Sequence, residues 1–337
     1  MRNIYDLTIK ELEDYFISIN EKKFRAVQVY EALYKRRVTS FDDMTNISKE
    51  VREKLKQDFS FYKIKMLIKQ QGKNVNKYLF ELEDGNKIES VLMFHDYGTS
   101  ICVSSQVGCN MTCAFCESGR LKKVRNLLAY EIVEQILQIE EDINKRITHV
   151  VLMGIGEPFD NYDNVLRFVK IINCGKGIDI GSRHITISTC GVIPGIKKFM
   201  NEEGQVNLAI SLHAPNNELR SRIMPINKAY PLNELMEVIK EYVKKTNRRV
   251  TFEYIMLDNI NDSEENAKEL AALLKGINCY VNLIPYNETE NIEFKRTKEW
   301  KIMKFYDILK KNKINVTIRK EFGGSVDAAC GQLRANN

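Results

Sequence analysis

The chain lacks any long apolar run. The longest, VVLMGIG at residues 150–156, is far too short to cross a bilayer, which takes about 20 residues. The first residues, MRNIYDLTIKELEDYF, are polar and acidic and contain no apolar segment of the signal-peptide kind. Internal repeats and low-complexity segments are also missing, so no repeat architecture is expected. These absences predict a cytoplasmic protein that does not enter a membrane.

A strong charge imbalance is missing as well. The formal net charge of +6 over 337 residues is only a mild lean toward anionic partners such as RNA. The hydrophobic content of 44% is ordinary for a globular protein with a sizeable core. The length suits one barrel of roughly 200–250 residues together with an accessory domain.

Cysteine, in contrast, is plentiful, with eight residues in the chain. In a cytosolic protein these are thiols, metal ligands or catalytic groups more often than structural disulfides. Cys174, Cys190 and Cys279 stand alone in apolar or mixed segments. We therefore predict that these three are buried packing residues.

The predicted secondary structure changes once within the first hundred residues, from helices to strands. Residues 1–58 have the apolar spacing of amphipathic helices, and Ser40 and Ser48 are placed to cap helix starts. Residues 59–98 have the pattern of strands, with a hairpin signal at Asp84-Gly85. We predict a small helical RNA-binding accessory domain at 1–58 and a β-hairpin linker at 59–98.

Strand and helix patterns alternate over residues 99–337, which favours βα units around a parallel sheet. The predicted strands are residues 100–105, 148–154, 184–190, 206–213, 250–257, 279–286 and 314–319. Polar or special residues follow several of these strands: Gly154–Pro158, Ser188-Thr189, Ser211–His213 and Asn287. In a βα barrel such residues gather at one mouth, so we expect them to line a ligand site.

The segment CNMTCAFC at residues 109–116 is a C-x₃-C-x₂-C run. A structural zinc site normally has four protein ligands, and no further Cys or His pair lies nearby at the usual spacing. A ferredoxin-type cluster also takes four cysteines. A [4Fe–4S] cluster held by three cysteines leaves one iron open, and that iron can chelate the amino and carboxylate groups of S-adenosylmethionine (SAM).

This cysteine run, with Phe115 before the last cysteine, resembles the radical SAM signature. The Gly-Ile-Gly-Glu-Pro stretch at residues 154–158 resembles the motif that contacts the SAM amino group in that superfamily. A narrower resemblance, to the RlmN/Cfr family of bacterial ribosomal RNA methyltransferases, covers nearly the whole chain. Its motifs here include CVSSQVGCNMTC, MGIGEP, ISLHAPN, MPINKAYP, EYIMLDNINDS, VNLIPYN and DAACGQL.

The resemblance implies an α/β fold, a partial (β/α)6 radical SAM barrel of the TIM-barrel type at residues 99–337. It assigns Cys330 as the cysteine that carries the methyl group, Cys102 as the thiol that resolves the protein–RNA adduct through a transient disulfide, and Glu89 as the base. The cluster ligands it implies are Cys109, Cys113 and Cys116. The SAM contacts it implies are Gly156, Glu157, Ser188, Ser211, Leu212, His213 and Asn287.

The implied reaction is methylation of an adenosine in 23S rRNA by a monomeric enzyme, with flavodoxin or ferredoxin as electron donor. The sequence leaves open whether transfer RNA is also a substrate, and whether C2 or C8 is methylated, the latter giving antibiotic resistance. The Glu-Pro ending of the 154–158 stretch favours C2. A zinc-bearing RNA-binding module without activity is the alternative from another class.

Three lysine- and arginine-rich segments are candidates for contacts with RNA phosphates. They are Lys35–Arg37, the series Lys63, Lys65, Lys69, Lys73 and Lys77, and the group Lys122, Lys123 and Arg125 after the cysteine loop. The chain departs from the family pattern at Glu117, which places a carboxylate beside the cluster site, and at Cys190, where serine is more usual.

Overall fold

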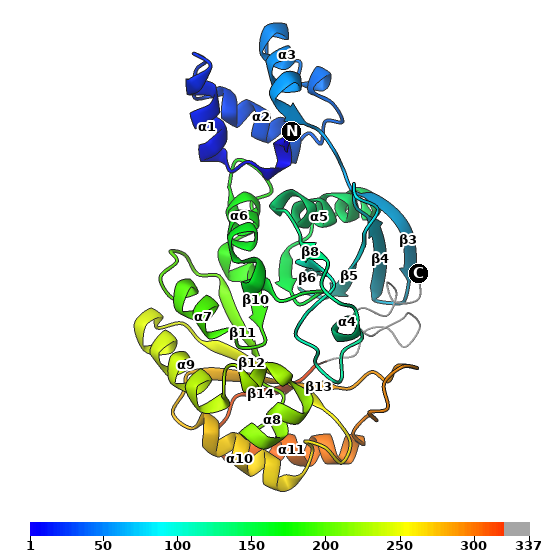
Figure 1. Cartoon of the computed structure of the whole chain (residues 1–337), viewed down its shortest axis with the longest axis vertical. Helices are drawn as coiled ribbons and strands as arrows, with labels where there is room; N and C mark the ends of the chain where they lie inside the picture. Colours follow the sequence, from blue (N-terminus) through cyan, green and yellow to red (C-terminus); the bar gives the residue numbers. More distant parts are fainter. Residues whose placement is uncertain (320–337) are drawn as a thin grey trace.

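The computed structural model describes residues 1–319 (Figure 1). A small helical domain comes first and consists of η1 (Ile4–Asp6), α1 (Ile9–Ser18), α2 (Arg25–Tyr34), η2 (Phe41–Asp43) and α3 (Lys49–Asp58). Its two ends meet because β1 (Arg2–Asn3) pairs in parallel with β2 (Phe59–Ser60). The predicted cap at Ser48 is confirmed, since its side chain accepts a hydrogen bond from the Val51 N–H.

The helical domain packs on two helices of the barrel, α5 (Ala129–Ile143) and α6 (Tyr162–Asn173) (Figure 1). Arg167 of α6 contacts Glu11 at 2.5 Å. Arg37 forms an ion pair with Glu140 of α5. Two of the three residues in the basic segment Lys35–Arg37 therefore form ion pairs within the protein, since Lys35 also contacts Glu31 at 3.2 Å.

A ten-stranded sheet runs through the rest of the described chain, in the order β14-β13-β12-β11-β10-β9-β6-β5-β4-β3, and β7 and β8 form a separate two-stranded sheet. The antiparallel part contains β3 (Lys65–Gln71), β4 (Val75–Glu81) and β5 (Lys87–His95). The parallel part contains β6 (Gly98–Cys102), β9 (His149–Leu152), β10 (Ile185–Thr189), β11 (Asn207–Ser211), β12 (Val250–Met256), β13 (Cys279–Pro285) and β14 (Val316–Ile318). The strands predicted as a linker thus continue the barrel sheet, because β5 pairs with β6.

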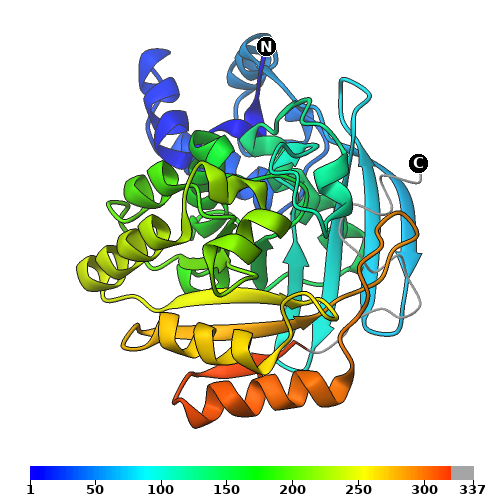
Figure 2. The same cartoon turned by 60° about the horizontal axis from the view of Figure 1, so that its bottom comes forward.

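Helices cover the outer face of the parallel strands (Figures 1 and 2). Besides α5 and α6 they are α7 (Ile193–Phe199), α8 (Asn217–Ile223), α9 (Leu232–Thr246), α10 (Glu264–Leu274) and α11 (Glu299–Lys311). Short elements fill the connections: β7 (Gln106–Val107), α4 (Glu117–Arg120), β8 (Arg125–Asn126), η3 (Pro158–Asn161), η4 (Ser182–His184) and η5 (Pro225–Lys228). No helix within residues 1–319 is long and apolar enough to span a membrane.

Sequence periodicity explains how these layers form. In α9, Leu235, Ile239 and Tyr242 are fully buried and recur every three or four residues, which places them on the face toward the sheet. In β13, buried and half-buried residues alternate, as expected for a strand with one face against helices and the other toward the barrel interior. The predicted hairpin is also present, with Gly85 at φ +78° between β4 and β5.

Candidate active site

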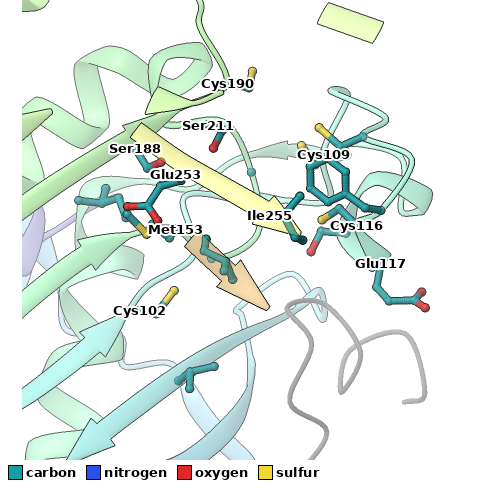
Figure 3. Close-up of a pocket in the computed structure, with 18 of the residues that line it drawn as sticks. Cys102, Cys109, Cys116, Glu117, Met153, Ser188, Cys190, Ser211, Glu253 and Ile255 are labelled. Carbon is teal, nitrogen blue, oxygen red and sulfur yellow. The ribbon is translucent and has the colours of Figure 1, made fainter. Parts of the chain in front are cut away.

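A cavity of about 350 Å³ opens where the parallel strands end, a size suited to a small-molecule ligand. Its lining combines β4, β5 and β6 with the cysteine loop and the ends of β9 to β13 (Figure 3). The predicted site residues that line it are Glu89, Cys102, Cys109, Cys113, Cys116, Gly156, Glu157, Ser188, Ser211, His213 and Asn287. Folding therefore brings together side chains from widely separated parts of the sequence.

Two predicted site residues have a different status. The Leu212 side chain is fully buried in the hydrophobic core, and its backbone carbonyl accepts a hydrogen bond from Arg220 Nε at 3.2 Å. Only the backbone atoms of Leu212 are therefore available for a contact with a ligand. Cys330 lies outside the described residues.

The cysteine loop is held by its backbone. The Cys109 N–H donates to the Leu121 carbonyl at 2.8 Å, and the Ala114 N–H donates to the Ile223 carbonyl of α8 at 2.9 Å. Gly108 has φ +79°, and a Cβ there would lie 2.1 Å from the Lys122 carbonyl oxygen, so the closure of the loop requires glycine. These contacts fix the loop without using the three thiols.

The donor set fits an iron–sulfur cluster. All three thiols line the cavity, and burial raises the pKa of each, to about 11 for Cys109. Bound iron would stabilise their thiolate forms. No three His, Cys, Asp or Glu side chains in residues 1–319 are grouped so as to hold one metal ion. Each cysteine of a [4Fe–4S] cluster binds a different iron, so the three sulfurs do not have to converge on one point.

The turn after β9 brings the backbone close to the cavity. Gly156 has φ +111°, and a Cβ there would lie 2.6 Å from Gln106 Cβ. The Glu157 N–H donates to Gln106 Oε1 at 2.9 Å. The buried Glu157 carboxylate accepts hydrogen bonds from the N–H groups of Cys190 at 2.8 Å and Phe159 at 3.0 Å. Glu157 thereby connects the ends of two neighbouring strands, β9 and β10.

His213 is buried at the end of β11 with φ +58°. Its Nδ1 accepts a hydrogen bond from the Ile255 N–H at 3.0 Å, which leaves Nε2 as the protonated nitrogen of the neutral ring. Burial lowers the pKa of His213 to about 3, so the ring is neutral at physiological pH. Phe115 of the cysteine loop packs edge-on against it, with ring centroids 4.9 Å apart.

Glu89 of β5 and Cys102 of β6 lie on the opposite wall, where the antiparallel part of the sheet joins the parallel part. Glu89 is 1% exposed, and its Oε1 lies 3.5 Å from Nζ of the equally buried Lys77. This position corrects the prediction that Lys77 belongs to a basic surface series, because its ammonium group is paired inside the cavity. Burial raises the pKa of the Cys102 thiol to about 11, while nearby Arg319 acts in the opposite direction.

Sequence reasoning missed several cavity residues. Cys190 was predicted to be a packing residue, and it is buried, but it also lines the cavity. Of the other two cysteines with that prediction, Cys279 is buried and Cys174 is half-buried. Glu253, in the middle of β12, is 4% exposed and lines the cavity. A carboxylate inside an otherwise apolar strand was the signal that could have identified it.

Glu117 is 3% exposed and therefore does not face solvent. Its Oε1 has no hydrogen-bond partner among residues 1–319. Glu117 follows the last cluster cysteine at the start of α4, but its side chain extends away from Cys109 and Cys116 (Figure 3).

A three-cysteine loop at the mouth of a partial βα barrel, followed by a G-x-G-E turn on the next strand, defines a radical SAM enzyme. Residues 103–271 match the radical SAM superfamily, and residues 2–60 match the family described as "Ribosomal RNA large subunit methyltransferase N-terminal domain". The chain belongs to the RlmN family of RNA methyltransferases. The predicted family and fold class are thus confirmed.

Relatives and a solved structure cover nearly the whole chain. A Spiroplasma citri protein named "Probable dual-specificity RNA methyltransferase RlmN" is 52% identical over 100% of this chain and 98% of its own. The protein of that name from Enterococcus faecalis is 54% identical over 99% and 96%. The crystal structure of a radical SAM methyltransferase from Sphaerobacter thermophilus is 40% identical, with a TM-score of 0.93 over 98% of this chain and 99% of that chain.

Membership in this superfamily confirms the predicted cofactors, a [4Fe–4S] cluster and SAM. It also removes the alternative of a zinc-bearing module without enzymatic activity.

Proposed function

We propose that this enzyme methylates C2 of an adenosine in 23S rRNA, and also an adenosine in transfer RNA, in the bacterial cytoplasm. The N-terminal match to a large-subunit ribosomal RNA methyltransferase domain supports the first substrate. The dual specificity in the names of the relatives supports a second RNA. The Gly-Glu-Pro sequence at residues 156–158 favours C2 over C8.

We assign both cofactors to the cavity. Cys109, Cys113 and Cys116 would hold the cluster. The remaining polar lining would hold SAM: Gly156, Glu157, Ser188, Ser211, His213 and Asn287, with Leu212 acting through its backbone. When bound, cluster and SAM supply a methyl group and a 5′-deoxyadenosyl radical that abstracts hydrogen.

Cys330 would carry the methyl group and become bonded through its methylene carbon to the adenine ring. Glu89 would take the ring proton, since its carboxylate is buried in the cavity beside Lys77. The radical adduct would also give up one electron, for which the bound cluster would be the acceptor. Release requires the Cys102 sulfur to bond to the Cys330 sulfur while the sulfur–methylene bond breaks. The electron pair of that bond goes to the methylene carbon, which takes up the proton lost by the Cys102 thiol and becomes the product methyl group. The resulting disulfide must be reduced before the next turnover.

RNA would be bound by the accessory domain at residues 1–58 and by basic groups around the mouth. Lys35 and Arg36 are exposed on the helical domain, and Lys122 and Lys123 follow the cysteine loop. Lysine and arginine contacts to phosphates provide affinity that weakens with salt. Because the predicted catalytic residues that the structure describes line a recess and not the outer surface, the target adenosine must leave its stack to reach them. Flavodoxin or ferredoxin would supply the electron that reduces the cluster.

The observation that carries this proposal is the joint placement of Glu89, Cys102 and the cysteine loop around one cavity. The test is to map modified adenosines by mass spectrometry in RNA from cells with and without this protein. We expect 2-methyladenosine in 23S rRNA and transfer RNA only when the protein is present. If 8-methyladenosine appears instead, the C2 assignment is wrong, and if transfer RNA is unmodified, the second substrate is wrong.

A further inference from the structure

Arg220 of α8 is fully buried, and its hydrogen-bond acceptors are all neutral. Its guanidinium donates to the carbonyls of Cys190 at 2.6 Å, Leu212 at 3.2 Å and Ser211 at 3.3 Å, and to Asn227 Oδ1 at 2.9 Å. Within residues 1–319 no carboxylate forms an ion pair with it. A buried cation without a counter-ion is strongly unfavourable, so this charge requires an explanation.

The contacts of Arg220 place it directly behind the candidate active site. Cys190 and Ser211 both line the cavity and lie at the ends of β10 and β11. The helix of Arg220 also supports the cysteine loop, because the Ile223 carbonyl accepts a hydrogen bond from the Ala114 N–H at 2.9 Å. Ala114 follows Cys113 directly.

The electrostatic neighbours of Arg220 also lie at the candidate active site. Burial lowers the pKa of Arg220, and the neighbouring thiols of Cys190 and Cys113 act against that effect. The ionisable neighbours of Arg220 are thus the thiols of Cys190, which lines the cavity, and of Cys113 in the cysteine loop.

We propose that Arg220 is a positioning residue whose guanidinium serves as the buried counter-charge of the iron–sulfur cluster and fixes the adjoining ends of β10 and β11. A [4Fe–4S] core with three thiolates carries net negative charge in both redox states, and more in the reduced state. The cation therefore favours reduction and raises the reduction potential of the cluster. This inference rests on the cluster assignment and is independent of which RNA carbon is methylated.

Arg220→Gln removes the charge and keeps a hydrogen-bonding side chain, whereas Arg220→Lys keeps the charge and loses the planar fork. Asn227→Ala is the matched control, since it removes one acceptor of Arg220 without changing any charge. The proteins are reconstituted with iron and sulfide without oxygen and titrated with dithionite as the one-electron donor. The reduced cluster is followed by electron paramagnetic resonance, and iron per chain is measured in parallel.

We expect Arg220→Gln to shift the reduction equilibrium at least tenfold toward the oxidised cluster, which for one electron is about 59 mV more negative. Arg220→Lys and Asn227→Ala should stay near the wild-type potential. A different outcome is that Arg220→Gln does not retain iron. In that case, iron retention by Arg220→Lys supports the proposal. Loss of iron from Arg220→Gln, Arg220→Lys and Asn227→Ala alike overturns it in favour of a structural role.

An unchanged potential in Arg220→Gln, or an equal shift in Asn227→Ala, also overturns the proposal. A wild-type chain that binds no iron overturns it together with the cofactor assignment. A wrong RNA target would instead leave the potentials as expected and alter only the modified nucleoside.

Discussion

Replacing Lys77 by methionine tests the buried ion pair on the wall of the cavity that carries Glu89. The side chains of Lys77 and Glu89 are both 1% exposed, and Nζ lies 3.5 Å from Oε1. Methionine has a similar length and no charge, so it occupies the space of the lysine side chain. The Glu89 carboxylate then lacks its ammonium neighbour. Removing one partner of a buried pair costs about 3–5 kcal/mol, and we expect the free energy of unfolding to fall by that amount.

The same sheet offers a matched control. Lys65 and Glu81 pair across β3 and β4 at 3.8 Å, but Lys65 is 71% exposed. Because solvent screens exposed pairs, Lys65→Met should cost only about 0–1 kcal/mol. The variant with both Lys77→Met and Glu89→Gln removes both charges. Its free energy of unfolding should therefore be about 2 kcal/mol higher than the sum of the two single changes predicts.

Urea unfolding of the iron-free chain, followed by far-ultraviolet circular dichroism, measures these differences. Lys77→Met should unfold at a clearly lower urea concentration than wild type and Lys65→Met. If Lys77→Met costs less than about 1 kcal/mol, or if the double variant is no better than the sum of the single ones, the pair does not stabilise this wall and the reasoning is refuted.

Three further predictions concern the thiols. Cys330→Ala should abolish RNA methylation while SAM cleavage remains measurable, and full methylation by this variant would remove the carrier role. Cys102→Ala should accumulate a protein–RNA crosslink through Cys330, visible as a slow band on a denaturing gel, and normal turnover without such a band would contradict the resolving role. Since burial raises the pKa of Cys102 to about 11, the thiol is protonated at neutral pH and only its thiolate attacks. The crosslink formed by wild type should therefore disappear about tenfold faster per pH unit from roughly pH 7 to 10, and a rate independent of pH would show that the thiol is deprotonated in another way.

Local chemistry made much of the fold and of the cofactor site predictable from sequence. The helix cap at Ser48 and the turn at Gly85 depend on residues within a few positions of one another. The alternation of strands and helices follows from side-chain periodicity, which is visible along the chain. The cysteine loop also combines neighbours, so the spacing in CNMTCAFC, together with the Gly-Ile-Gly-Glu-Pro stretch at residues 154–158, indicates its chemistry.

Contacts between residues far apart in the sequence decided which side chains line the cavity. Lys77 is four positions from Glu81 and Lys65 is sixteen, yet pairing of β4 with β5 takes Lys77 into the cavity beside Glu89, while Lys65 remains at the surface. Cys190 has the sequence surroundings of a packing thiol, and only the junction of β9 with β10 places it against Glu157.

Arg220 and Arg222 show most clearly what the sequence determined and what it could not. The sequence shows two arginines close together after the SLHAPN segment, and the structure places both on the short helix α8. Residues two apart on a helix point in different directions, and in the folded chain Arg220 is fully buried while Arg222 is exposed. Which of the two became the buried cation depends on the rotation of α8 against the ends of β10 and β11. That rotation is set by packing across the barrel, so it was decided only by the tertiary structure.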